Sequence, residues 1–169
     1  MTGRKQRKAF AKWEDDTRLR AHETAKDLVI AMVTGQPTAA TPDRIGVVLE
    51  PGERVLAECP VRFLQERPVG MRAGPDWFPP IRPWLVTSQR IVGRLGDDRL
   101  YIWRWGQVVG CRVELGPPVE TVALDLHDGS GVGWIGPGAA PLGVAAVWRL
   151  HGPEALIHHT GLAPLRQAG

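Results

Sequence analysis

Residues 84–95 have the sequence Trp84-Leu-Val-Thr-Ser-Gln-Arg-Ile-Val-Gly-Arg-Leu95. Two short apolar runs flank a polar triplet, a pattern that predicts two antiparallel strands joined by a tight turn. The hydroxyl of Thr87 can bond to the backbone of such a turn and hold it shut. Arg90 can then reach carbonyl groups or an acid across the sheet. We therefore expect Thr87 and Arg90 to be structural, and a phosphate-binding pocket that includes Arg90 is the alternative.

The same alternation of apolar and polar residues continues on both sides of this hairpin. Turn signals recur about every 8–15 residues, which is typical of an all-β sandwich or barrel. Pro60 lies inside the first of these strands and cannot donate to a ladder, so we expect an edge strand or a bend there. Besides the hairpin, the expected strands are 53–64, 99–105, 109–115, 121–126 and 131–135.

The period changes near the C-terminus. Apolar residues at helical spacing predict a helix from about Ala139 to Gly152, followed by a second helical turn at 153–159. Residues 160–169 are expected to form a loop anchored by Leu162 and Leu165.

Residues 4–34 are predicted to form one long amphipathic helix, because apolar and small residues recur at spacings of three and four. Its last turns are apolar nearly all round, so that end must be buried against the domain or against another chain. Residues 35–44 predict a linker that allows the helix to stand apart. The candidate interaction residues of the helix are Phe10, Trp13, Leu28, Val29 and Met32.

The first turns of this helix are basic, with no acid among residues 1–12. They form either a solvated helix start or a contact to phosphate groups, in a nucleic acid or an anionic lipid surface. Because basic charges oppose the dipole at a helix N-terminus, we expect the first residues to be disordered rather than helical. The basic residues concerned are Arg4, Lys5, Arg7, Lys8 and Lys12.

Residues 66–83 are rich in proline and glycine and predict a long loop. Loops of this length inside a compact domain are usually functional. The loop carries Trp77 and Phe78, which will not sit freely in water. This aromatic pair either folds back over the end of the sheet or forms a tip that docks on a membrane or a partner.

Three runs carry a resemblance to a known family. These are Pro51-Gly-Glu53 with the strand after it, Trp84 to Val92, and Trp134-Ile-Gly-Pro137 with Leu150-His-Gly-Pro-Glu-Ala-Leu156. Over residues 45–160 the chain resembles bacterial PH-like and GRAM-like domain proteins of a small actinobacterial type. The resemblance implies a mainly β fold, a small antiparallel barrel capped by a C-terminal helix.

The resemblance also implies where a ligand binds. Family members of the PH type often bind phosphoinositide headgroups through basic residues in the loops near the first strands, and this region offers Arg62, Arg67, Arg72 and Arg82. The expected organisation is a helix over 1–34, a linker over 35–44, the barrel domain over 45–160 and a tail over 161–169.

No catalytic or metal-binding constellation stands out. His158 and His159 are adjacent and would point to different faces, so we expect no metal site. Ser88, Ser130, His127 and Asp125 all lie in turn-type contexts that explain them, so we expect no cofactor and no enzyme. Cys59 and Cys111 lie in strand-like contexts and are expected to be reduced core residues. No apolar run reaches 18 residues, and the expected location is cytoplasmic, with peripheral membrane attachment as a further possibility.

The sequence favours a non-catalytic interaction module that binds a protein partner, or assembles with itself, through the N-terminal helix. One alternative is a peripheral membrane adaptor that uses residues 4–12 and the Trp77–Phe78 tip. A second alternative is a nucleic-acid-binding accessory protein that uses the basic arm and the tryptophans. Trp103 and Trp105 share one strand face and could stack on bases, but residues in this position more often fill a barrel core or one sheet face.

Overall fold

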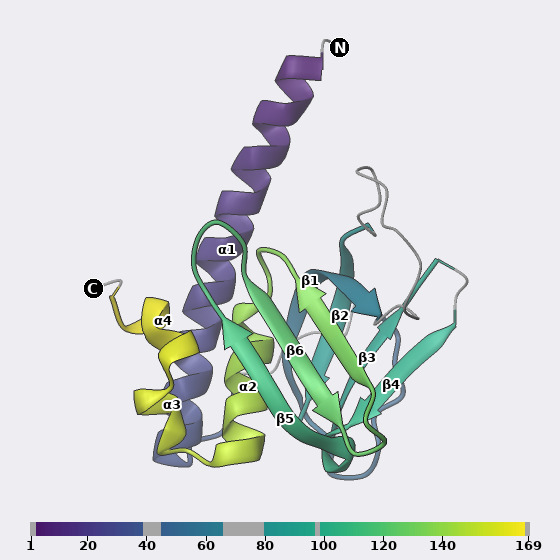
Figure 1. Cartoon of the computed structure of the whole chain (residues 1–169), viewed down its shortest axis with the longest axis vertical. Helices are drawn as coiled ribbons and strands as arrows, with labels where there is room; N and C mark the ends of the chain where they lie inside the picture. Colours follow the sequence, from purple (N-terminus) through teal and green to yellow (C-terminus); the bar gives the residue numbers. More distant parts are fainter. Residues whose placement is uncertain (1–2, 39–44, 66–79, 97–98, 168–169) are drawn as a thin grey trace.

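The computed structural model describes residues 3–38, 45–65, 80–96 and 99–167 (Figure 1). A long helix, α1 (Gly3–Thr34), precedes a sheet, and shorter helices follow it. The strands are β1 (Val55–Gln65), β2 (Arg82–Thr87), β3 (Arg90–Arg94), β4 (Leu100–Arg104), β5 (Val108–Glu114), β6 (Thr121–Leu126) and β7 (Gly131–Ile135). The other helices are η1 (Trp105–Gln107), α2 (Ala140–His151), α3 (Ala155–His158), η2 (Thr160–Leu162) and α4 (Ala163–Gln167).

The strands form one antiparallel sheet in the order β4-β3-β2-β1-β7-β6-β5. The predicted antiparallel β architecture with flanking helices is therefore confirmed. The structure shows a curved sheet rather than a complete barrel: β4 and β5 are the two ends of the strand order, and no ladder joins them among the described residues. The short helix η1 joins these edge strands in sequence, so the sheet curves without closing its ladder.

Strand β1 has neighbours on both sides, so the edge position suggested by Pro60 is wrong. Its first half pairs with β2 and its second half, from Arg62, pairs with β7. Pro60 lies opposite Pro83 near the end of the β1–β2 ladder. Neither proline has an N–H to donate, and this ladder ends one pair later, at Val61 and Arg82, while β1 continues beside β7 from Arg62. Pro60 is therefore tolerated in a central strand, because it lies where β1 changes its partner from β2 to β7.

A bulge in β1 changes which residues face the core. Val55 pairs with Thr87 and Ala57 with the next residue of β2, Val86, so two residues of β1 oppose one. Ala57 is fully buried in the main core, as the alternation predicts. Val55 instead joins a small second cluster with Val47, Leu85 and Val92 on the other face of the sheet.

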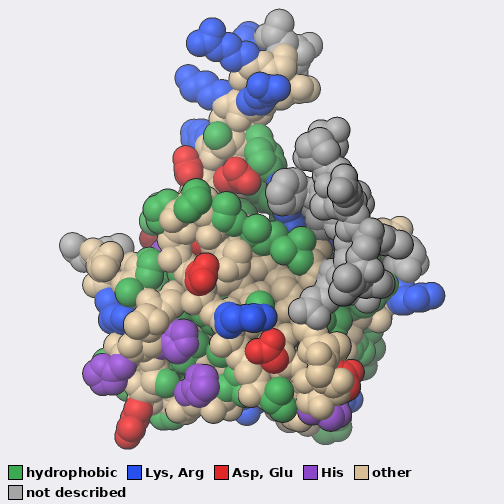
Figure 2. All heavy atoms as spheres, viewed as in Figure 1, with side chains coloured by type: hydrophobic (Ala, Val, Ile, Leu, Met, Phe, Trp, Pro, Cys, Tyr) green, Lys and Arg blue, Asp and Glu red, His purple; other side chains and the backbone are tan. Residues whose placement is uncertain are grey.

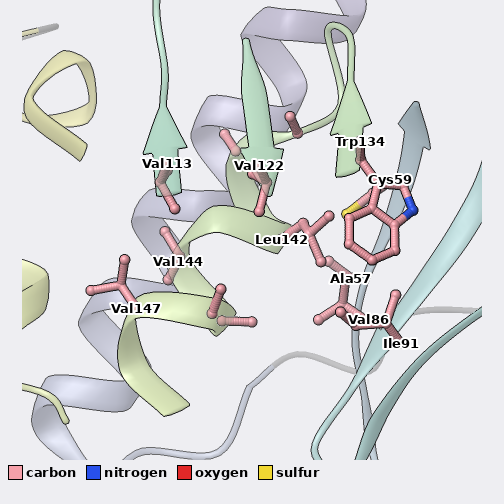
Figure 3. Packing of buried hydrophobic residues seen from close by; sticks show 14 of the residues in the cluster. Ala57, Cys59, Val86, Ile91, Val113, Val122, Trp134, Leu142, Val144 and Val147 are labelled. Carbon is pink, nitrogen blue, oxygen red and sulfur yellow. The ribbon is translucent and has the colours of Figure 1, made fainter. Parts of the chain in front are cut away.

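The main core lies between the curved sheet and α2. Figure 3 shows Leu142 of α2 pointing toward Cys59 and Trp134 in the sheet, with Val144 and Val147 further along the same helix. Gly143 brings α2 close to the strands, since a Cβ there would meet Val113 Cγ1 at 2.8 Å. The helix that the sequence predicts at the C-terminal end of the domain therefore forms one wall of the core.

Two expectations about the chain ends are wrong. Residues 3–12 are helical rather than disordered, because Arg, Lys, Gln and Ala are strong helix formers and the opposing dipole costs only about 0.3–1 kcal/mol. The tail is not a loop: η2 and α4 continue the fold to Gln167. Leu162 and Leu165 anchor this segment in the core, as predicted.

Candidate interaction surface

The second half of α1 packs within the same chain. Its buried residues are mostly small, so the helix approaches α2 closely, and the two helices lie side by side in Figure 1. Leu28 belongs to the main core, and Val29 and Met32 pack against it half-buried. These three predicted interaction residues thus hold α1 on its own domain. The buried set is Thr17, Ala21, Ala25, Leu28 and Ala31.

The first half of α1 projects beyond the domain (Figure 1). Every residue from Gly3 to Trp13 is exposed. Phe10 and Trp13 are 45% and 38% exposed, and their rings stack with centroids 5.7 Å apart. Two large apolar rings held together in water form a small apolar surface with a defined shape, which is a candidate interaction surface.

The projecting end is strongly basic. Figure 2 shows Lys and Arg side chains gathered around it, with acidic side chains just below. The basic residues predicted as contacts, Arg4, Lys5, Arg7, Lys8 and Lys12, are all exposed on this end. Three acids, Glu14, Asp15 and Asp16, follow after Trp13. Opposite charges therefore occupy successive segments of one helix.

A groove lies where α1 leaves the domain. The spacing of Phe10, Trp13 and Thr17 places them on one helix face, and Thr17 is buried against the domain. A cavity of about 450 Å³ continues that face, and Trp13 and Thr17 share its lining with Pro60 and Pro141. Arg20 and Glu58 supply its charged groups. The Oε2 atom of Glu58 is buried and has no hydrogen-bond partner among the described residues.

An ionic contact fixes the base of the projecting end. Glu120, 1% exposed, lies just before β6, and its Oε1 is 2.5 Å from Nε2 of His22 and 3.8 Å from Nε of Arg18. Neither Glu120 nor Glu58 was among the predicted site residues. Glu120 could have been found, because it lies in phase with the buried Val122 and Leu124 of the following strand.

The Thr87–Arg90 turn is a closed buried network, as predicted. Arg90 Nε donates to Glu53 Oε1 at 2.8 Å and its Nη2 donates to Glu53 Oε2 at 2.9 Å and to the Val48 carbonyl at 2.8 Å. The Thr87 hydroxyl donates to Glu53 Oε1 at 2.6 Å and accepts from the backbone of Gln89 and Arg90. The acid across the sheet is therefore Glu53, and Arg90 is fully engaged.

This network lowers the pKa of Glu53. Burial raises the pKa of Glu53, but the hydrogen bonds from Arg90, the Glu50 backbone and Thr87 outweigh burial, so its pKa lies below the ordinary value near 4.5. A carboxyl group whose pKa falls on folding stabilises the fold at pH values above its ordinary, unfolded-state pKa. This contribution is lost as the pH falls through the folded-state pKa.

We therefore expect the free energy of unfolding to fall as pH drops below about 4.5. Urea titrations at a series of pH values check this. The matched control is the double variant Glu53→Gln/Arg90→Met, which lacks the titrating group and is expected to show a shallower acid slope. Equal slopes in the two proteins would contradict a role for Glu53 in acid sensitivity.

The tryptophans do not form an exposed stacking platform. Trp105 is buried and its indole N–H donates to the Thr87 carbonyl at 2.9 Å. Trp103 packs half-buried within a cluster of rings, 5.1 Å from Phe63 and 5.7 Å from Trp84 between centroids. Both residues serve the interior, as the core-filling interpretation predicts, and they do not offer a base-stacking surface.

Both cysteines are free, and Cys59 is buried as predicted, whereas Cys111 is half-buried. Burial raises the pKa of the Cys59 thiol to about 12, so it is not a thiolate at neutral pH. Within the described ranges no three His, Cys, Asp or Glu side chains gather as a metal site. The rings of His151 and His159 do stack, with centroids 6.3 Å apart, a proximity that the sequence did not indicate.

Trp77, Phe78, Arg67 and Arg72 lie outside the described residues. Arg62 and Arg82, the other basic residues implied by the family resemblance, lie in β1 and β2 respectively. Among the described helices, none is long and apolar enough to cross a bilayer. Neither known protein-family models nor curated protein sequences match this chain.

Proposed function

We propose that this protein is a non-catalytic interaction module of PH-like type that binds a macromolecular partner through the projecting end of α1. The observation that carries the proposal is the exposed Phe10–Trp13 pair, held on a helix whose other half is anchored in the core. The strand order, with α2 packed over the curved sheet, supports the PH-like class.

The position of the aromatic pair restricts the shape of the partner. Phe10 and Trp13 lie on the helix face that contacts the domain lower down, so the domain stands beside the surface they offer. A flat surface cannot approach this face without meeting the domain first. A narrow element, such as a single helix, fits beside it. The geometry therefore favours a protein partner over a planar membrane.

We expect the double variant Phe10→Ser/Trp13→Ser to lose partner binding, because it removes both exposed rings and leaves the buried residues of α1 unchanged. Light scattering for self-association and affinity capture with purified full-length protein measure the loss. Leu19→Ser is the matched control, because Leu19 is 63% exposed on the opposite face of the same helix. Binding that survives in the double variant, by both measurements, would refute the proposed role of the aromatic pair.

The basic residues of the tip favour a second candidate function, attachment to an anionic membrane. Charges on the helix end farthest from the domain could reach lipid headgroups even if the aromatic face does not. Co-sedimentation with vesicles containing phosphatidylglycerol tests this idea at low and at physiological salt. No binding at low salt, where electrostatic attraction is greatest, would eliminate it.

A further inference from the structure

We infer that the partner of the projecting end of α1 is the same end of a second copy of this chain, packed antiparallel to it. The inference rests on the proposed function, since it names the partner of the same surface. Three features support this pairing: the charge order along the helix, the register that joins the aromatic pairs, and the groove at the base of the projecting end.

The charge order selects an antiparallel partner. The basic stretch at 4–12 has no acid, and the acids Glu14, Asp15 and Asp16 follow it after Trp13. In an antiparallel pair the basic stretch of each copy runs beside the acidic stretch of the other, and two-fold symmetry makes this match twice. A parallel pair would instead place like charges side by side.

One register joins the apolar rings as well as the charges. When Phe10 of one copy lies opposite Trp13 of the other, the stacked pairs combine into one four-ring apolar seam. Arg7 and Glu14 lie on the same side of this seam, because residues seven positions apart are separated by about two helical turns. Two-fold symmetry brings the same side of both helices together, so Arg7 faces Glu14 of the second copy, and the pair occurs twice.

The groove can receive the rest of the second copy's helix. In the same register, the first turn of the second copy, with Arg4 and Lys5, lies level with residues 17–20. The cavity of about 450 Å³ is at this level, and there Glu58 Oε2 is buried without a partner. A buried carboxylate oxygen that lacks a donor favours a cationic neighbour. Glu58 therefore offers a carboxylate oxygen to the basic helix end, beside Arg20 of the same lining.

Charge exchange tests the arrangement in the full-length protein. Light scattering over a concentration series is expected to give a mass approaching twice the 18.5 kDa of one chain. Arg7→Glu and Glu14→Arg are each expected to return the mass to that of one chain, because each places two like-charged pairs at the seam. The combined variant Arg7→Glu/Glu14→Arg is expected to restore the dimer, since the pairs are rebuilt with their charges reversed.

Lys8→Glu is the matched control. It makes the same change of charge one residue away, on the outer face of the helix, and is expected to leave the dimer intact. Far-UV circular dichroism confirms that each variant is folded. A dimer that survives Arg7→Glu, or no rescue in the combined variant, would overturn the antiparallel register. A monomeric wild type that still captures another protein or anionic vesicles through Phe10 and Trp13 would overturn self-pairing, while the proposed interaction surface would stand.

Discussion

The variant Arg90→Met is expected to lower the free energy of unfolding by about 3–5 kcal/mol, because it leaves the carboxylate of Glu53 buried without its cation. Arg90 and Glu53 are 5% and 6% exposed, so water cannot replace the lost donors. The Val48 carbonyl loses its donor as well. Urea denaturation followed by tryptophan fluorescence measures the change.

Two further variants separate charge from packing at this site. Arg104→Met removes an arginine that also makes a two-point contact to a glutamate, Glu50, but at an exposed position, so a much smaller loss is expected. The double variant Glu53→Gln/Arg90→Met removes both buried charges and is expected to recover part of the stability. If Arg90→Met costs no more than Arg104→Met, the buried pair is not what holds the turn shut.

A comparable loss, about 3–5 kcal/mol, is expected for Phe63→Ala. Phe63 is 5% exposed, and its ring lies 5.1 Å from Trp84 and 5.8 Å from Trp134 between centroids. The centroid of its ring also lies 6.1 Å from that of Tyr101 and 5.1 Å from that of Trp103. Removing the ring opens a cavity bordered by four rigid aromatic side chains, which cannot close over it without leaving their rotamers.

Near-UV circular dichroism reports on the same change, because the tryptophans lose their fixed neighbour and their signal should weaken. The matched control is Val109→Ala, in a strand of the same sheet but 63% exposed, for which little change in stability is expected. A loss for Phe63→Ala no larger than the loss for Val109→Ala would show that the aromatic cluster is not central to the core.

Much of the fold follows from local patterns in the sequence. Alternation predicts the strands around Trp84 and Leu124, and the polar turn predicts the roles of Thr87 and Arg90. Alternation says nothing about pairing between distant strands, however, so it could not show that β4 and β5 are the two ends of the sheet. The bulge in β1 was equally hidden, because Val55, Leu56 and Ala57 are all apolar and the change of phase between them cannot be seen.

The interaction surface was predicted only in part. Phe10 and Trp13 were identified because helical spacing places them on the apolar face. The same spacing continues to Leu28, and spacing alone cannot tell the exposed part of a stripe from the part covered by the domain. The three-dimensional arrangement makes that division near Thr17. The phase of the following strand indicates that Glu120 is buried, but the partners of Glu120 and the surroundings of Glu58 come from residues far away in sequence, which no local pattern reveals.

Strand β1 has a consequence for how the molecule unfolds. Since it pairs with β2 over one half and with β7 over the other, neither half of the sheet keeps its full ladder if β1 leaves. The two halves are therefore thermodynamically coupled, and amide protons of β3 and β6 should exchange with solvent through the same global opening. A single cooperative transition is thus expected, although the sheet is divided between two ladders that share one strand.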